Sequence, residues 1–362
     1  MKAKALQFGK AMSAALFVLL LVVAGTKNAL AQTQVVTLQH GEDISVFYGT
    51  NAFVEAHTAA ADGDIVTLSS GSYNTPTQIT KAITIRGAGV VADTVAGTDR
   101  TIFAQSVTFN VLNDSIAVNM EGILFTSAML YKHLHNPKFT RCSFNSISRI
   151  GNTIGPTMLF NALFVNCMVN TFDYTGASGT MLVNSVVWKN VGLSSTSDSN
   201  PRAVILYNSI FRAGSSNSSG FMIAGVSAFN SIIIGHSTTT TTYQNYSSAN
   251  SFINCIGIQL SSYASVFGSA YIAGCITKTS YEAVFESLTG TGTLTLESPC
   301  ILKDEIATGF LGSDGTQVGI YGGFMPYSNH PSYMVLKRCN VANRSTIDGK
   351  LSVEIEVVTE EE

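Results

Sequence analysis

Phe164-Val165-Asn166-Cys167-Met168 is the first clear copy of a five-residue phrase that recurs along the chain and decides its fold. Five further copies follow: Leu182-Val183-Asn184-Ser185-Val186, Leu206-Tyr207-Asn208-Ser209-Ile210, Ala228-Phe229-Asn230-Ser231-Ile232, Phe252-Ile253-Asn254-Cys255-Ile256 and Ile272-Ala273-Gly274-Cys275-Ile276. With looser copies around Cys142 and Cys300, the Cys/Ser position advances by 25, 18, 24, 22, 24, 20 and 25 residues. A drifting period near 22 residues is too long for a coiled-coil heptad and is typical of stacked solenoid coils.

Each copy places two short β-favouring runs on either side of one corner residue. This residue is Asn in five copies and Gly in the sixth: Asn166, Asn184, Asn208, Asn230, Asn254 and Gly274. Asn and Gly tolerate the left-handed αL conformation that other residues avoid. One αL residue between two strands, repeated in every coil, predicts a parallel β-helix of roughly ten coils, each hydrogen-bonded only to its neighbours. The corner side chains would then stack as a structural ladder.

The columns on both sides of the corner are apolar, headed by Phe164 and Met168. Side chains alternate along a strand, so both columns and the corner residue share one face, which we interpret as the interior. An αL bend can shift this parity by one, so the orientation of the Cys/Ser column stays open. Arg141 and Pro299 replace the corner residue in the looser copies, which predicts different turns there.

The composition narrows the class of protein. Charged residues make up 12% of the 362 residues, against roughly 25% in ordinary soluble domains. Polar but uncharged turns suit a long β-solenoid, and the regular apolar positions disfavour intrinsic disorder. The formal net charge of −3 provides no basic surface for a nucleic-acid partner.

The first 31 residues have the pattern of an export signal. Lys2, Lys4 and Lys10 precede an apolar run over residues 14–24, and Ala29-Leu30-Ala31 is a small-x-small cleavage sequence. We expect cleavage after Ala31 and a location in the periplasm, on the outer surface or outside the cell. An uncleaved membrane anchor is the alternative, but the run is short and no second apolar segment follows, so the mature chain is expected to lack a transmembrane segment.

Five of the six cysteines fill the column that Ser fills in other copies: Cys142, Cys167, Cys255, Cys275 and Cys300. A position shared by Cys and Ser asks for a small side chain, which favours free, packed thiols. A disulfide between adjacent coils, such as Cys142–Cys167, is the alternative in an exported protein. No His accompanies these cysteines at ligand spacing, so they do not predict a metal site. Cys339 stands outside the repeat.

We expect four parts along the chain: a signal peptide over 1–31, a lead strand and capping helix over 32–61, the β-helix over 62–334 and a hairpin module over 335–362. Residues 51–61 are Ala-rich and form the best helix candidate of the mature chain. Asp348-Gly349 suits a tight hairpin turn, and the strand after it alternates apolar and polar residues.

The residues after the expected helix carry a resemblance. Residues 61–73 (ADGDIVTLSSGSY) and 83–89 (ITIRGAG) resemble the beginning of pectin-lyase-like right-handed parallel β-helix proteins. With residues 37–41, 47–49, 314–323 and 348–355, the chain is also similar to secreted β-helix proteins of Gram-negative anaerobes that have no assigned activity. The resemblance covers most of the mature chain and implies an all-β, right-handed β-helix. It implies no particular reaction.

The sequence offers no obvious catalytic constellation. The acids within the repeat are few and scattered: Asp173, Asp198, Glu282, Glu286 and Glu297. Candidate bases are Arg149, Lys189, Arg202 and Arg212, and none has a carboxylate two residues away. A calcium-dependent lyase needs clustered carboxylates with a base, and a glycoside hydrolase needs a carboxyl pair. Asp62-Gly63-Asp64 lies where turn chemistry explains it, and Gly235-His236 only faintly resembles the Gly-His-Gly of polygalacturonases. The catalytic residues are therefore unknown.

Three further features are candidates for binding. His133-Leu134-His135 would place both imidazoles on one side of a strand, as a metal pair requires, but two exposed loop histidines are the favoured interpretation, and no metal ligands are assigned. Trp188 could stack on a sugar ring, but packing between coils is favoured. Tyr243, Tyr246 and Tyr263 fall in or near loops that could line a glycan groove.

These observations favour an exported non-catalytic protein, glycan-binding or adhesive at the cell envelope, whose partner is a polysaccharide or a cell-surface glycan. No cofactor is expected. The alternative is a polysaccharide lyase or glycoside hydrolase, for which calcium is the possible cofactor. A structural envelope component is the second alternative. The first two hypotheses separate on whether three or more charged side chains converge in a groove. The oligomeric state is not predicted.

Overall fold

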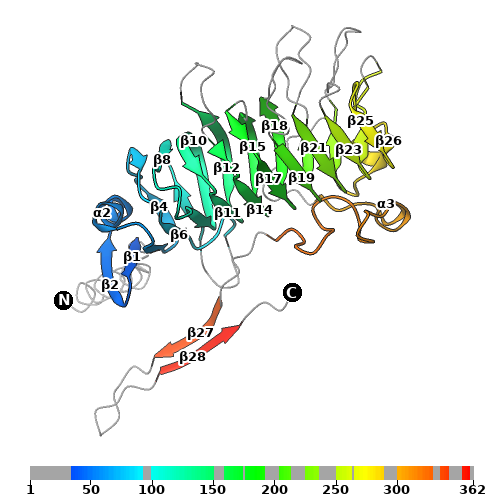
Figure 1. The fold of residues 1–362 in the computed structure, drawn as a ribbon. Helices are drawn as coiled ribbons and strands as arrows, with labels where there is room; N and C mark the ends of the chain where they lie inside the picture. The colour runs from blue at the N-terminus through cyan, green and yellow to red at the C-terminus, as the bar shows by residue number, and fades with distance from the viewer. Residues whose placement is uncertain are drawn as a thin grey trace, which may run out of the picture. The chain divides into compact units, whose positions relative to one another are not determined.

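The computed structural model of the chain describes residues 34–92, 99–150, 159–173, 176–191, 204–212, 225–235, 250–262, 265–288, 300–328, 335–341 and 353–358. All of them belong to one compact unit, Gln34–Glu362. Strands dominate the described residues, and they stack side by side along the unit (Figure 1). Within these residues, no helix has both the length and the apolar character needed to cross a membrane.

The first of two large sheets carries the strand that precedes each corner. Its order is β2 (Asp43–Tyr48), β1 (Val35–His40), β3 (Ile65–Leu68), β6 (Thr84–Arg86), β9 (Asn119–Glu121), β11 (Lys138–Thr140), β14 (Leu163–Val165), β17 (Thr180–Val183), β19 (Val204–Tyr207), β21 (Val226–Phe229), β23 (Ser251–Ile253) and β25 (Tyr271–Ala273). From β3 onward every neighbour is parallel, as a β-helix requires.

The second sheet carries the strand that follows each corner. Its order is β16 (Ala177–Ser178), β13 (Leu159–Phe160), β10 (Ile123–His135), β12 (Ser143–Arg149), β15 (Met168–Asp173), β18 (Val186–Val191), β20 (Ile210–Arg212), β22 (Ile232–Ile234), β24 (Ile256–Ile258) and β26 (Ile276–Lys278). The long strand β10 also pairs in parallel with β7 (Thr101–Phe103) and β8 (Val107–Asn110), which in turn pair with β4 (Gly71–Tyr73) and β5 (Gln78–Ile79). The parallel β-helix expected from the sequence is thereby confirmed.

The corner residues have the backbone conformation that the repeat predicts. Their φ angles are positive, between 45° and 63°, at Asn166, Asn184, Asn208, Asn230, Asn254 and Gly274. Arg141 has a φ of 50° as well, so the prediction of a different turn in its coil was wrong. Pro299 lies outside the described residues. A second αL column at Asn136 and Asn161 went unpredicted, and there the Asn161 amide donates to Oδ1 of Asn136 at 3.3 Å.

The αL corner reverses which side chains face inward. Phe164 and its column partners as far as Phe252 lie in the interior, and so does Val169, one residue beyond Met168. Ile272, in the last coil, is 50% exposed. The column headed by Met168 lies outside the coil, in a separate apolar cluster. The interpretation of both flanking columns as interior was therefore wrong for the second one, because the bend shifts the alternation by one residue.

That shift places the Cys/Ser column inside the coil, where it connects consecutive corners. The backbone N–H of Ser185 donates to Oγ of Ser209 at 3.1 Å, and the N–H of Ser209 donates to Oγ of Ser231 at 3.0 Å. At the same time Oγ of Ser209 donates to the carbonyl of Tyr207 at 2.8 Å. Either Ser or Cys can occupy this position, because both side chains are small and both can donate and accept a hydrogen bond. Cys300 does not belong to this column and packs in the outer cluster.

A return segment, residues 300–327, covers the outer apolar column. It begins beside the 3₁₀ helix η1 (Tyr281–Ala283), contains helix α3 (Asp304–Gly309), and contributes Val318 and Ile320 to the outer cluster. It then crosses the corners in reverse order and bonds to their amides. Oδ1 of Asn230 accepts from the N–H of Ser313, and Nδ2 of Asn184 donates to the carbonyls of Ile320 and Gly322 at 2.8 and 2.6 Å. Nδ2 of Asn166 donates to the carbonyl of Pro326 at 3.3 Å.

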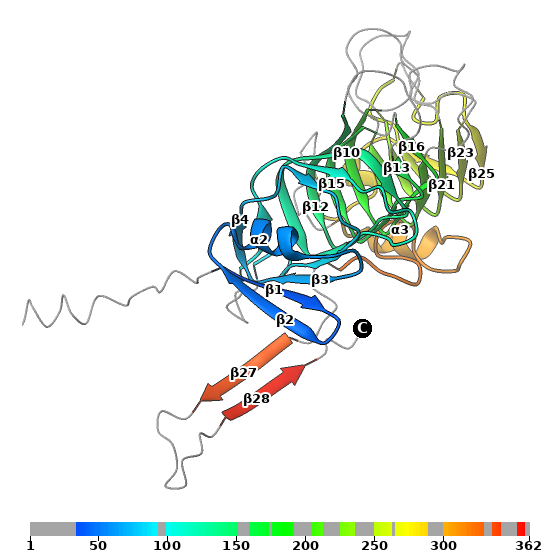
Figure 2. The ribbon, with the colours of Figure 1, turned by 60° about the vertical axis from the view of Figure 1, so that its left-hand side comes forward.

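The N-terminal end of the solenoid is closed as expected. Helix α2 (Ala52–Ala59) buries Phe53, whose ring stacks on Phe103 with centroids 4.8 Å apart. Strands β1 and β2 form an antiparallel hairpin that adds to the edge of the first sheet (Figure 2). The expected C-terminal hairpin is present as β27 (Val335–Val341) and β28 (Val353–Val358), paired antiparallel. Its Asp348-Gly349 turn lies outside the described residues.

Ser209→Ala should destabilise the protein by about 1–3 kcal/mol, because the buried N–H of Ser185 loses its acceptor. Ser209→Cys is the matched control, since it keeps a small side chain that donates and accepts, and it should lose less than half as much. Equilibrium urea unfolding of the wild type and both variants measures these differences. Equal stability of all three proteins would contradict a connecting role for this column.

Candidate functional site: a charged groove on the first sheet

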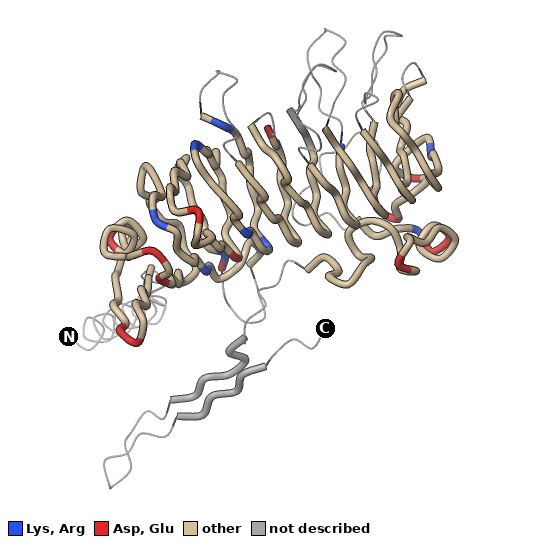
Figure 3. Tube along the Cα trace, in the orientation of Figure 1, with Lys and Arg blue, Asp and Glu red and all other residues tan. Residues whose placement is uncertain are grey.

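The outer face of strands β6, β9 and β11 forms a groove of about 200 Å³. Alternation along each three-residue strand turns the middle residue inward and the two end residues outward. The strand register aligns the outward residues in two rows across the sheet, Thr84–Asn119–Lys138 and Arg86–Glu121–Thr140. Figure 3 shows that charged positions are sparse along the rest of the stacked strands in the described part of the chain.

Two exposed cations and one half-buried anion define the electrostatics of the groove. Arg86 and Lys138 are exposed at opposite ends of the two rows. Glu121 lies between them and accepts from Nη1 of Arg141 at 3.4 Å, with the two side chains 19% and 15% exposed. The groove therefore combines one carboxylate that pairs with Arg141 and two cations that are exposed to solvent.

Arg141 is held in a conformation that an L-residue rarely adopts. Its φ of 50° costs on the order of 1 kcal/mol or more for a side chain other than Gly or Asn. The N–H of Arg141 donates to the carbonyl of Val165 at 2.9 Å, which fixes the corner. Its Nε is buried without a hydrogen-bond partner among the described residues. The corner conformation of Arg141 thus belongs to the structural repeat, and its guanidinium group holds Glu121 at the groove.

An aromatic pair continues the same outer face farther along the sheet. Tyr207 and Phe229 lie on adjacent strands, in the column that begins with Arg86 and Glu121, and their rings stack with centroids 5.0 Å apart at 14°. Tyr207 is 37% exposed. Sequence reasoning missed this pair because both residues sit inside the repeat, where they read as packing residues.

The candidate catalytic residues of the sequence do not converge in the groove. Arg149 and Asp173 lie on β12 and β15 of the second sheet. The guanidinium of Arg212 lies 4.5 Å from the Trp188 ring centroid, and Trp188 is only 6% exposed, so its ring packs rather than offering a stacking face. Glu282 and Glu286 are exposed near η1. Outside the described residues, or described only by backbone, are Asp198, Arg202, His236, Tyr243, Tyr246, Tyr263, Glu297, Lys189 and Cys339.

The Asp62-Gly63-Asp64 turn behaves as expected from turn chemistry. Oδ1 of Asp62 accepts from the N–H of Ala82 at 2.7 Å, and Oδ2 of Asp64 accepts from the N–H of Ala61 at 2.8 Å. The side-chain hydrogen bond from Asn113 is the main cause that lowers the pKa of Asp62. These carboxylates hold the chain where the helix leads into the first coil.

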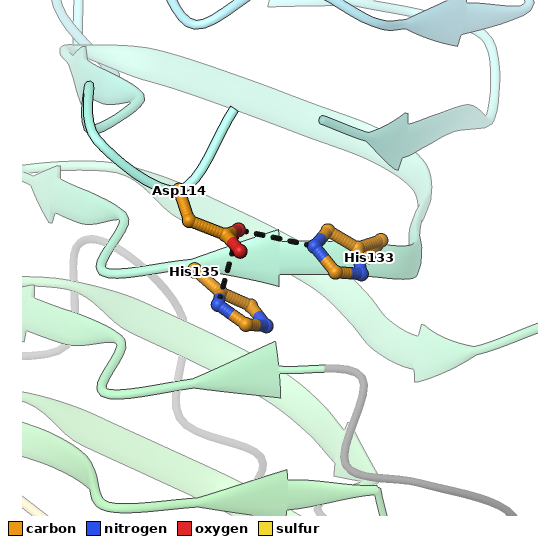
Figure 4. Close-up of side chains that lie close together, drawn as sticks. All are labelled: Asp114, His133 and His135. Carbon is orange, nitrogen blue, oxygen red and sulfur yellow. Dashed lines mark hydrogen bonds and ion pairs between the residues drawn. The ribbon is translucent and has the colours of Figure 1, made fainter. Parts of the chain in front are cut away.

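His133 and His135 lie at the end of strand β10 and not in a loop, which corrects the interpretation as exposed loop residues. Their rings point to the same side and stack with centroids 4.4 Å apart (Figure 4). Asp114, which sequence reasoning did not consider, bridges them: its Oδ1 lies 3.1 Å from Nε2 of His133 and 3.1 Å from Nδ1 of His135. Of the described residues, these three form a set of side chains placed to ligate one metal ion.

Comparisons with known proteins add little to this geometry. No protein family matches the sequence, and no curated protein matches it. A solved structure described as a polygalacturonate lyase fused with a self-assembling amphipathic peptide aligns with 69% of this chain and 69% of its own. The aligned sequences are 10% identical and the TM-score is 0.23, so the fold rests on the strand pairing described above and not on this alignment.

The cysteine thiols differ sharply in their environment. The five cysteines with described side chains are free, in agreement with the expectation of packed thiols. Burial raises the pKa of Cys167 and of Cys300 to about 12. Cys275, in the last coil, is the exception, because a hydrogen bond from the neighbouring Cys255 thiol lowers the pKa of Cys275 below the usual value of a thiol. A half-buried thiol of lowered pKa is reactive, whereas buried thiols of raised pKa are inert.

Iodoacetamide should therefore alkylate Cys275 before Cys142, Cys167, Cys255 and Cys300 in the native protein. The rate should rise with pH through a midpoint below that of a free thiol, since the thiolate is the nucleophile. Mass spectrometry of peptides from timed reactions measures the order of labelling. Cys255→Ala removes the donor and should move the midpoint to higher pH, and an unchanged midpoint would contradict the assigned cause.

Proposed function

We propose that this protein is an exported, non-catalytic binding protein for an acidic polysaccharide or cell-surface glycan, which it holds on the outer face of the first sheet. The observation that carries the proposal is the groove in which Arg86 and Lys138 stand exposed around the paired carboxylate of Glu121. A uronate carboxylate would accept charge-assisted hydrogen bonds from these two cations. Asn119 and Thr140, in the same groove, offer hydrogen bonds to sugar hydroxyl groups.

The aromatic pair supports the same ligand class. Tyr207 and Phe229 stack on each other in the column that continues from Arg86 and Glu121, and Tyr207 is 37% exposed. Three strand spacings separate β11 from β19, or roughly 14 Å, and an oligosaccharide chain can cover that length. The groove and the exposed Tyr207 would be two separate points of attachment for such a chain, since the outward Val165 and Val183 between them are buried.

A polysaccharide lyase is the second candidate, and one observation favours it. Arg86, Glu121 and Lys138 meet the condition of three converging charged side chains. Calcium, however, takes six to eight oxygen ligands with several carboxylates, and a hydrolase needs two carboxyl groups. In the described part of this groove Glu121 is the one carboxylate, and Arg141 pairs with it. The residue types therefore favour binding over cleavage.

Export supports an encounter with such glycans. The N-terminal pattern of Lys2, Lys4 and Lys10, an apolar run and Ala29-Leu30-Ala31 is that of a signal peptide cleaved after Ala31. The proposed location is the periplasm, the outer surface or the medium. An adhesive role would follow if the bound glycan belongs to another cell.

The double variant Arg86→Ala/Lys138→Ala should weaken binding to polygalacturonate at least tenfold, because each charge-assisted hydrogen bond contributes about 1.5–3 kcal/mol. Retention of the purified protein on immobilised polygalacturonate and on a neutral glucan measures the effect. Binding should also weaken as salt is raised. Lys132→Ala removes an exposed lysine of the second sheet and is the charge control, which should bind as the wild type does.

The same samples distinguish the alternatives. Unsaturated products or new reducing ends, with or without calcium, would refute the non-catalytic proposal and establish the lyase or hydrolase. Equal weakening by Lys132→Ala would show that net charge rather than the groove governs binding. Failure of the wild type to bind any acidic or neutral glycan would refute glycan binding and favour the structural envelope component.

A further inference from the structure

Asp114, His133 and His135 bring two imidazoles and one carboxylate together from two separate segments. Strand β10 supplies both histidines, and the intervening Leu134 is fully buried, so the two imidazoles lie on its outer side. The segment between β8 and β9 supplies Asp114 (Figure 4). Each residue offers one ligand atom, and these atoms all lie within 4.8 Å of one another.

The distances suit a small divalent ion. Zinc binds imidazole nitrogen and carboxylate oxygen at about 2.0–2.2 Å, so neighbouring ligand atoms of a tetrahedral site lie about 3.3 Å apart. Oδ1 of Asp114 lies 3.1 Å from both Nε2 of His133 and Nδ1 of His135. A bound ion lies in the plane of each imidazole, so binding turns the two rings out of their 18° stacked arrangement. The torsion that turns a His ring is broad, and side-chain exposures of 32% and 26% leave room for the turn.

The backbone around the three residues is fixed in advance. The N–H of Val111 donates to the carbonyl of His133 at 2.9 Å, which ties the Asp114 segment to β10. Oδ1 of Asn113 accepts from the N–H groups of Ser115 and Ile116 at 3.0 and 3.2 Å, and its Nδ2 donates to Asp62 at 2.8 Å. Asp114 is therefore carried on a turn that is held at both sides, and a fixed backbone lowers the cost of assembling ligands.

We propose that Asp114, His133 and His135 form a binding site for a first-row divalent transition metal ion, with Zn²⁺ as the ion that fits best. Two imidazoles with one carboxylate suit Zn²⁺ and its neighbours in the series, whereas Ca²⁺ and Mg²⁺ prefer all-oxygen sites. Three protein ligands leave a further position for water or an outside ligand. This site is distinct from the glycan groove in its residues and does not depend on the proposed function.

Titration calorimetry of the purified protein, without an affinity tag, against ZnCl₂ tests the proposal. We expect one Zn²⁺ per chain and no competition from millimolar Ca²⁺ or Mg²⁺. Asp114→Asn and His135→Asn should each lower the affinity at least about 10- to 100-fold, because the loss of a direct ligand costs no less than the loss of an outer-shell partner. His40→Asn is the matched control, because His40 also pairs with an aspartate, Asp64 at 2.7 Å, but belongs to no three-ligand set of the described residues.

The absorption spectrum of bound Co²⁺ tests the site independently of the measured affinity. Co²⁺ in place of Zn²⁺ should give the visible absorption of a site with nitrogen and oxygen ligands, and Asp114→Asn should change that spectrum. Circular dichroism checks that each variant keeps the fold. Absence of Zn²⁺ binding in the wild type would overturn the proposal. Equal loss in His40→Asn, or binding that survives both site variants, would overturn it as well.

Discussion

The left-handed corner between each first-sheet strand and the next second-sheet strand is the constraint on which this structure depends. It turns the chain at the same point in every coil and so keeps the parallel strands in register. It also moves the alternation of side chains by one residue. As a result the Cys/Ser side chains face inward and connect corners, while the column headed by Met168 faces outward. Asn satisfies this constraint with little strain, which explains its recurrence.

The outward apolar column must be covered from solvent, and the coils alone do not cover it. Ile210, Ile232 and Ile256 are fully buried because residues after the last coil turn back over them. The close approach depends on small residues, since a Cβ on Gly312 would collide with the Asn230 side chain and a Cβ on Gly319 would collide with the Ile232 side chain. The return segment thereby completes the hydrophobic packing outside the coil, in addition to the core inside it.

The repeat, the corners and the capping helix could be predicted because each rests on local chemistry that recurs along the sequence. The inward and outward columns could not, since one αL residue decides parity and sequence alternation alone does not reveal it. The groove could not be predicted from the sequence either. Arg86, Glu121 and Lys138 are separated by 35 and 17 residues and meet only through the strand register. Asp114 could not be predicted for the same reason, although the His133-Leu134-His135 spacing indicated two of the three possible metal ligands.

In an ordinary solenoid each coil touches only the next, so the ends can fray while the middle stays folded. The hydrogen bonds between the return segment and Asn166, Asn184 and Asn230 connect coils that lie up to three strands apart in the stack. Opening of any one of these coils would disturb the contacts of the others. The central repeats should therefore unfold as one cooperative block rather than coil by coil, a behaviour closer to a globular domain than to a linear array.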